Sequence, residues 1–273
     1  MQNKLIASIT TVLLIMPLLA CGGFRPRATY NWHLVLEVDP STPNREAATL
    51  ETVEVLNSRL NHLGVIGARV SVVGASKEGR IRIDLPEVAD RARFKNFITA
   101  RGSLQLVHVI SDPSPAPVKT YSDEDEAKST IKTAQDRKVL LYAAEPFSSS
   151  ANKVRFVVVE WPPIVDGRDV RTASAVPNYG STKKTYQIMF TLKEAAAEKF
   201  GAWTAANINQ YIAVVLNDEV KSIAFIKGQI FDTGEINGDF TKTSAEDLAQ
   251  ILMSGPLPAA VKIVEEGRSD TAE

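Results

Sequence analysis

Chemistry in this chain could begin at Cys21, the only cysteine among its 273 residues. Cys21 ends the apolar run LLIMPLLA, and a thiol at such a place could be a reactive nucleophile, a buried core group or a point of acylation. The residues Leu18-Leu19-Ala20 before it form the sequence at which bacterial lipoproteins are cut and then acylated on the cysteine sulfur. We therefore expect a lipid anchor at Cys21, with an uncleaved N-terminal helix or a buried structural thiol as the alternatives.

The segment before the cysteine has the pattern of a signal peptide. A short apolar run, residues 5–20, follows Lys4. A permanent membrane helix needs roughly 20 apolar residues, so this run is short for one. We expect residues 1–20 to be removed and residues 21–31 to form a lipidated tether. Gly22 stands where inner-membrane lipoproteins often carry aspartate, which favours the outer membrane.

A second candidate for chemistry is Asp232-Thr233-Gly234, which is the active-site tripeptide of aspartic proteases. Their reaction needs two carboxylates that share one proton, because like charges about 3 Å apart cannot both ionise. The chain has a single copy of the tripeptide; a homodimer could supply the second, but the 39 residues after Gly234 are too few for the β-rich half-site. We expect a turn before a strand at this place and keep an acid protease around Asp232 as a remote alternative.

Metal and cofactor sites have little support in the sequence. His33, His62 and His108 are far apart along the chain and have no carboxylate or thiol at the spacing of metal ligands. Glycine-rich phosphate-binding patterns and the G-x-S-x-G nucleophile pattern do not occur in the sequence. We expect no metal, no cofactor and no enzymatic activity.

Charge and length restrict the class of protein further. The 31 basic and 32 acidic residues nearly balance, so we expect no nucleic-acid partner and no electrostatic attraction to anionic lipid. With a single cysteine the chain cannot form an internal disulfide, and its stability must come from apolar cores. The length beyond the signal peptide is enough for about two ordinary domains.

The elements expected in the first half form a βαββαβ order. HLVLEVD alternates like a half-buried strand, and the helix after it carries an apolar stripe that includes Leu50, Leu56 and Leu60. This order is the split βαβ arrangement of a ferredoxin-like domain, expected over residues 32–110. The predicted elements are a strand at 33–39, a helix at 44–63, strands at 68–74 and 80–86, a helix capped by Asp90, and a strand at 103–110.

The pattern of the second half predicts another α+β domain over residues 161–267. A linker with connecting strands precedes it at 111–160, and a tail follows it at 268–273. Asn217-Asp218 is a typical hairpin turn between two apolar strands. The other expected elements are a short helix from 122 to about 137, strands at 139–144, 153–161, 186–192 and 256–266, a helix capped by Thr191 with Glu194, and a helix signalled by Thr243 with Glu246 that ends at Gly255.

The motifs Lys199-Phe200-Gly201, GEINGDF at 234–240 and GPLPA at 255–259 are the most specific signals in the chain. They closely resemble the head subdomain in the first periplasmic domain of SecD, a membrane subunit of the bacterial protein-export machinery. HLVLEVD and the helix with NSRLNHLGV look like the base subdomain, so the resemblance covers about residues 32–110 and 160–266. Its motif positions are Gly201, Gly234, Gly238, Phe240, Gly255 and Pro258.

The resemblance implies a protein that engages unfolded exported polypeptides outside the cytoplasm, accessory to the Sec translocon. A lipid anchor replaces the first membrane helix of the family and no membrane helix follows, so we expect no proton-driven motor. An extended chain could add to a free sheet edge, and Lys153–Glu160 and Ser222–Ile226 are the candidate edges. The alternative is a reused scaffold, an envelope lipoprotein that binds another protein or a ligand.

Overall fold

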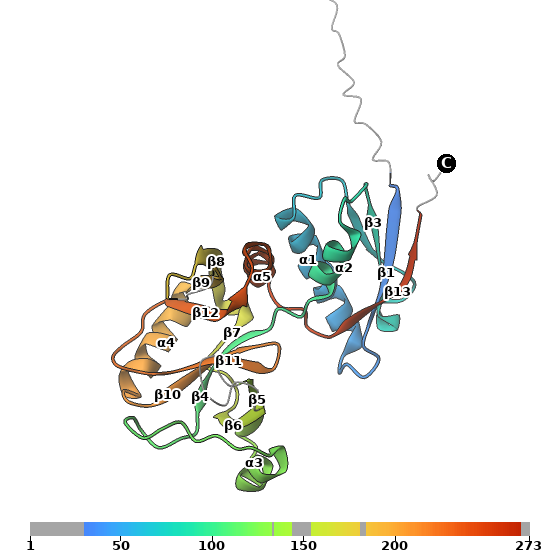
Figure 1. The fold of residues 1–273 in the computed structure, drawn as a ribbon. Helices are drawn as coiled ribbons and strands as arrows, with labels where there is room; N and C mark the ends of the chain where they lie inside the picture. The colour runs from blue at the N-terminus through green and yellow to red at the C-terminus, as the bar shows by residue number, and fades with distance from the viewer. Residues whose placement is uncertain (1–29, 133, 144–153, 181–183, 269–273) are drawn as a thin grey trace, which may run out of the picture.

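The computed structural model describes residues 30–132, 134–143, 154–180 and 184–268, which form two lobes (Figure 1). We call them the base lobe, residues 30–100 and 259–268, and the head lobe, residues 103–254. Two connecting segments join the lobes, one after helix α2 and one before strand β13 (Figure 1). Cys21, the expected signal peptide and most of the expected tether lie outside the described residues.

The base lobe is a four-stranded sheet in the order β13-β1-β3-β2, with two helices on one face. Its core contains the alternate side chains Trp32, Leu34, Leu36 and Val38 of β1. Its elements are β1 (Trp32–Val38), α1 (Arg45–His62), β2 (Arg69–Val72), the 3-10 turn η1 (Ser76–Glu78), β3 (Arg80–Leu85), α2 (Arg91–Thr99) and β13 (Val261–Gly267).

The strand expected to complete the base lies elsewhere, in the head lobe. The ferredoxin-like order is confirmed, but β13 from the C-terminal end of the chain supplies its last strand, antiparallel to β1. The strand expected at 103–110 is β4 (Leu104–Val109), which pairs with β10. The reason is burial, since β4 is apolar on both faces and suits an internal position. By contrast β13, with exposed Glu265 and Glu266, suits the edge of a sheet.

The head lobe contains a closed barrel and a separate three-stranded sheet. Strands β10, β11, β5, β6 and β4 pair in that order, and β4 pairs back onto β10. The second sheet has the order β12-β9-β8. The barrel and sheet strands are β4, β5 (Arg137–Ala143), β6 (Val154–Glu160), β7 (Val165–Asp166), β8 (Val170–Pro177), β9 (Tyr186–Leu192), β10 (Tyr211–Leu216), β11 (Glu219–Phe225) and β12 (Thr233–Phe240).

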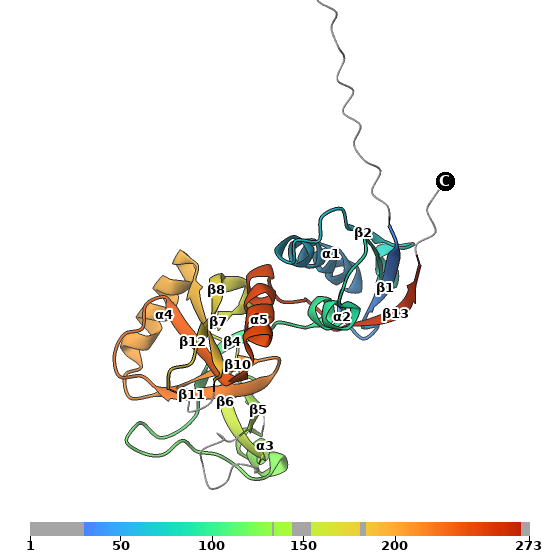
Figure 2. The same cartoon turned by 45° about the horizontal axis from the view of Figure 1, so that its top comes forward.

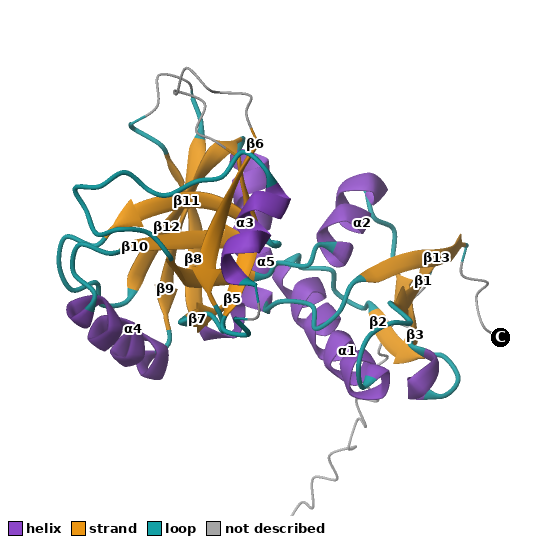
Figure 3. Ribbon diagram, turned by 90° about the horizontal axis from the view of Figure 1, so that it is seen from below, coloured by secondary structure: helices purple, strands orange, loops and turns teal. Residues whose placement is uncertain are grey.

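Three helices and a 3-10 turn complete the head lobe. Helix α5 contacts β8 and β9 on the side that faces the base, whereas α4 lies on the far side of the head (Figures 1 and 3). Strands β5 and β6, expected as connections in a linker, are thus part of the head barrel. The remaining elements are α3 (Glu124–Ile131), η2 (Gly167–Asp169), α4 (Glu194–Ala206) and α5 (Lys242–Ser254).

Most local signals in the sequence are confirmed. The Asp90 side chain accepts a hydrogen bond from the Arg93 amide and caps α2. Asn217 and Asp218 have φ angles of 54° and 66° and form the tight turn between β10 and β11. Helix α5 ends before Gly255, whose φ is 85°.

Two expected helix caps are wrong by a few residues. Thr191 lies within β9, where its hydroxyl contacts the Thr172 hydroxyl at 2.7 Å across the strand pair, and α4 begins after Lys193 instead. Thr241, rather than Thr243, caps α5 by accepting from the Ser244 amide. Thr191 is paired on both sides within the sheet and Thr241 directly follows the last residue of β12, so each helix begins just after the strand that precedes it.

The buried face of α1 differs from the expected apolar stripe. Leu50 is 52% exposed, whereas Thr52 and Arg59 are fully buried. Thr52 can be buried because its hydroxyl donates to the carbonyl of Ala48 at 2.6 Å. Burial of Arg59 needs another explanation, since a charged side chain loses its hydration there.

The Arg59 guanidinium is bonded to backbone carbonyls at the ends of two helices. Nη1 donates to the carbonyls of Phe97, at 3.1 Å, and Ile98, at 2.8 Å, in the last turn of α2. Nη2 lies 3.5 Å from the carbonyls of Arg101 and Gly255, one in each connecting segment. Helix C-termini are partially negative, so these carbonyls stand in for a carboxylate partner. Burial lowers the pKa of Arg59 to about 10, which leaves it charged at neutral pH.

Replacing Arg59 by methionine keeps the apolar stem and removes these hydrogen bonds. We expect the free energy of unfolding to fall by about 3 kcal/mol, because the carbonyls stay buried without a donor. Chemical denaturation followed by circular dichroism measures the change. Arg69→Met, at an exposed position of β2, is the matched control and should change stability by less than about 0.5 kcal/mol. An equal loss in both variants would contradict the assignment.

Candidate functional site

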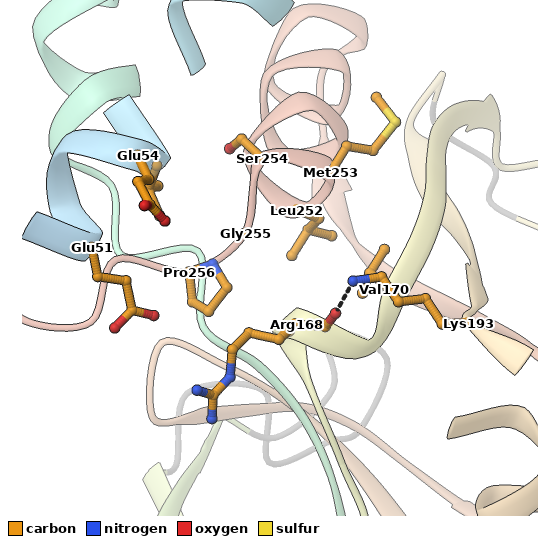
Figure 4. A pocket seen from close by; sticks show the side chains of 12 residues that line it. Glu51, Glu54, Arg168, Val170, Lys193, Leu252, Met253, Ser254, Gly255 and Pro256 are labelled. Carbon is orange, nitrogen blue, oxygen red and sulfur yellow. Dashed lines mark hydrogen bonds between the residues drawn. The ribbon is translucent and has the colours of Figure 1, made fainter. Parts of the chain in front are cut away.

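A cleft lies between the lobes where α1 of the base faces the head (Figure 4). Its volume is about 270 Å³, and we call it the hinge cleft. The base contributes Glu51 and Glu54, and the head contributes Arg168 and Lys193 (Figure 4). The Lys193 ammonium donates to the Arg168 carbonyl at 2.6 Å, which holds the two basic residues on one wall. The cleft thus has an acidic wall from the base and a basic wall from the head.

Beside this cleft the two lobes are fastened together through α5. Ile251 on one face of the helix packs in the base core, whereas Leu252 belongs to the head core. The Arg93 guanidinium of α2 binds the Asp247 carboxylate through two nitrogens, at 2.9 and 2.7 Å (Figure 2 shows α2 and α5 side by side). The hinge cleft is therefore bordered by a packed interface.

A larger groove lies on the head, along α4 and away from the base. Its volume is about 730 Å³, and we call it the α4 groove. Small residues of α4 line one side, and the segment before β12 forms the other side with Phe231, which is 67% exposed. The lining residues are Arg171, Leu192, Glu194, Ala197, Glu198, Gly201, Ala202, Gln229, Phe231 and Asp232.

Gly201 allows α4 to approach the opposite side of this groove. A Cβ atom added at Gly201 would lie 3.2 Å from Nε2 of Gln229 and 3.7 Å from the carbonyl oxygen of Ile230. One turn later the Thr204 hydroxyl accepts a hydrogen bond from the Ile230 amide at 2.9 Å. The shape of the groove therefore depends on this contact between the helix and the segment before β12.

The other motif positions lie away from the α4 groove and support local geometry. Phe190 of β9 lies directly opposite Gly234 of β12, and a Cβ atom at Gly234 would overlap its ring. Gly238 is covered in the same way by the ring of Phe240, 2.6 Å from such an atom. Gly255 and exposed Pro258 lie in the connecting segment before β13. These positions do not form one site, and a role for them in binding stays a prediction.

The geometry at Asp232 does not match an acid protease. The turn before β12 is confirmed, and the Asp232 carboxylate faces Nη2 of Arg171 at 3.2 Å and accepts from the Thr233 hydroxyl at 3.0 Å. The nearest charged partner of Asp232 is thus an arginine, whereas the protease mechanism needs a second carboxyl group at this place to share one proton. Asp232 is instead a charged side chain at one end of the α4 groove.

The three histidines have separate partners. His33 Nε2 lies 3.1 Å from a carboxylate oxygen of Glu265, and His62 Nδ1 lies 2.8 Å from the Ser58 carbonyl. His108 contacts Glu160 and packs edge-on against Trp203. In the ranges that the structure describes, no group of three potential metal ligands is present.

The two candidate sheet edges differ in how much of their backbone is paired. Strand β6 pairs with β5 along its whole length, and on its other edge with Val109 and Tyr121, so the expectation of a free edge there is wrong. Strand β11 pairs with β10 over its whole length but with β5 only at Glu219 and Val220. A binding edge on β11 stays a prediction, limited to residues 222–225.

Comparison with known families decides what kind of chain this is. Residues 49–111 match the model of the N-terminal part of the P1 domain of protein translocase subunit SecDF, and residues 140–259 match that of the SecDF P1 head subdomain. The chain belongs to the SecD P1 domain family. The resemblance inferred from the sequence is thus confirmed. The head match begins within β5, consistent with the place of β5 and β6 in the head barrel.

Individual relatives agree with this assignment. SecD of Aquifex aeolicus (strain VF5) is 35% identical over 81% of this chain and 40% of its own length. SecD of Koribacter versatilis (strain Ellin345) is 31% identical over 81% of this chain and 39% of its own. A solved SecDF structure, described as a membrane component that enhances protein export, is 25% identical with a TM-score of 0.60, covering 85% of this chain and 98% of that one.

The chain spans about 40% of the length of these two curated relatives. Both are named as protein translocase subunits, and the family is a protein translocation component. Across the described ranges, no helix is long and apolar enough to cross a membrane.

The close contact at Gly234 gives a test of the head architecture. Gly234→Ala places a methyl group against the Phe190 ring, so we expect the free energy of unfolding to fall by about 1–3 kcal/mol. Gly228→Ala is the matched control, because a Cβ atom there meets nothing within 4 Å, and its effect should stay below about 0.5 kcal/mol. Thermal or chemical denaturation distinguishes the two. Phe190→Leu combined with Gly234→Ala should lose less than the two single changes together, and strict additivity would argue against the contact.

Proposed function

We propose that this chain is a lipid-anchored, extracytoplasmic SecD-like module that binds exported polypeptides in the α4 groove, accessory to Sec protein translocation. Its membership in a family of protein translocation components supports a role in protein translocation. The α4 groove carries the proposal, because it combines a volume of about 730 Å³ with an exposed aromatic side chain.

The lining of the α4 groove suits an unfolded chain better than a single small ligand. It is open along α4, and its chemistry is mixed: Ala197, Gly201 and Ala202 provide a smooth apolar strip, with Phe231 across from them. An apolar strip of this kind can bury many different side chains without fixed hydrogen bonds. Exposed aromatic residues rimmed by polar groups are typical of protein interaction surfaces.

The anchor is the second part of the proposal. Lipid on Cys21 would hold the protein on the periplasmic side of a membrane, and Gly22 favours the outer membrane over the inner one. Ten residues, 22–31, separate Cys21 from β1, and ten residues reach at most about 35 Å even when fully extended, so lipid on Cys21 would keep the base close to the membrane surface. Several acyl chains on one residue give stable attachment, whereas a single chain binds only marginally.

Phe231→Ser tests the groove. Because Phe231 is already exposed, the change should leave the fold intact, and we expect affinity for an unfolded apolar polypeptide to fall about tenfold through loss of apolar contact. Fluorescence anisotropy with the full chain in detergent and a labelled unfolded peptide measures the affinity. Tyr179→Ser is the matched control, because Tyr179 is 92% exposed and lies outside the groove.

The same two positions allow a test in cells. A photo-crosslinking phenylalanine analogue at position 231 should capture a newly exported precursor, whereas the analogue at position 179 should not. Equal capture at both positions, or none at either, would count against binding in the α4 groove.

Cys21→Ser tests the anchor. We expect the wild-type chain to incorporate labelled palmitate and to fractionate with membranes, and the variant to do neither, because no thiol remains for acylation. Membrane fractionation with labelled palmitate measures both properties. A variant that still fractionates with membranes, without label, would point to the uncleaved N-terminal helix.

A further inference from the structure

The α4 groove is charged unevenly. Its lining includes one basic residue, Arg171, and three acidic residues, Asp232, Glu194 and Glu198. Arg171 and Asp232 pair with each other at 3.2 Å, so their charges largely cancel. Glu194 and Glu198 form no ion pair with any residue that the structure describes. The lining therefore carries two acidic groups that are not neutralised by an ion pair with a described residue.

The two glutamates lie one helical turn apart on the exposed rim of the groove. Glu194 is the first residue of α4, where the partial positive charge of the helix N-terminus offsets part of its charge. Glu198 lies a turn beyond that end and lacks this compensation. Lys193 does not neutralise either of them by bonding, because its ammonium is bonded to the Arg168 carbonyl in the hinge cleft. Glu198 is thus the stronger site for an incoming cation.

The apolar part of the groove adjoins these glutamates. Ala197 and Ala202 line the groove, with Phe231 on the opposite side. Ala197 lies between Glu194 and Glu198 in sequence, and Ala202 lies one turn after Glu198. A ligand that lies along α4 therefore meets an apolar contact and a negative charge within one or two helical turns. A polypeptide segment that carries lysine or arginine next to apolar side chains satisfies both.

We propose that the α4 groove selects polypeptide segments in which basic residues stand next to apolar ones, over segments that are neutral or acidic. This inference rests on the proposed function, since it names which part of a chain the groove would hold. It assigns separate roles to two kinds of lining residue: Phe231 and the small residues of α4 bury apolar side chains of the ligand, whereas Glu194 and Glu198 favour ligands with basic residues.

Three rhodamine-labelled peptides of about 12 residues test the selection with the full chain in detergent. They share the same apolar residues and differ at four positions, which are lysine, glutamine or glutamate. We expect the lysine peptide to bind about tenfold more tightly than the glutamine peptide at low salt, and the glutamate peptide to bind most weakly. The difference should shrink at about 0.2 M salt, because exposed charges are screened.

Glu198→Gln should weaken binding of the lysine peptide about threefold and leave the glutamine peptide unchanged. Asp125→Asn on α3 is the matched control: it makes the same change of charge at an exposed position outside the groove and should leave all three peptides unchanged. An equal effect of both variants would mean that overall charge, rather than Glu198, sets the preference and would overturn the proposal.

Phe231→Ser separates failure of this proposal from failure of the proposed function. If all three peptides bind equally and all lose affinity in Phe231→Ser, the groove binds polypeptides and the charge selection is overturned. If no peptide binds, or binding does not depend on Phe231, the proposed function itself is overturned. A concentration-dependent self-association of the chain that excludes the peptides would identify a second copy as the occupant and overturn both.

Discussion

The structure depends on the buried charge of Arg59. A guanidinium without water needs acceptors for its donors, and here Nη1 and Nη2 donate to carbonyls of α2 and of both connecting segments, whereas Nε has no partner among the described residues. The paths of the two connections are therefore determined by a polar group of the base. Space at the first connection is small, because Gly102 has a φ of 65° and a Cβ atom there would overlap Cγ2 of Ile251 and lie 3.3 Å from Nη2 of Arg59. Apolar packing of Ile251 then adds to an arrangement already set by hydrogen bonds.

The motif positions that revealed the family turn out to be mainly architectural. Gly234 and Gly238 make room for the rings of Phe190 and Phe240, and Gly255 ends α5. Gly201 alone among them lines the α4 groove. A family can therefore be recognised from residues that shape its fold, while the surface proposed here to contact a partner is made by side chains such as Phe231 that carry no such signature.

Local features could be predicted from the sequence, and long-range ones could not. Asp90 and Asn217 act on neighbours a few residues away, so their patterns are sufficient to place a cap and a turn. The sheet that β4 joins depends on β10, more than a hundred residues later, and alternation within β4 contains no information about that partner. The expected stripe of α1 contains the buried Leu56 and Leu60, but the burial of Arg59 was missed for a related reason, since it is possible only because carbonyls from distant segments surround this side chain.

The insertion of the head between α2 and β13 has a consequence for the order of folding. His33 and Glu265 meet across the β1 and β13 pair although they are 232 residues apart in sequence. Every residue of the head precedes β13 in the sequence. During synthesis, which starts at the N-terminus, the barrel can therefore be completed while one edge of β1 is still unpaired. Contacts over such a separation form slowly, because the loop must close first. The base is therefore the first lobe to begin folding and the last to complete it. Until β13 pairs, the unpaired edge of β1 is the part of a newly made chain that most needs protection from aggregation.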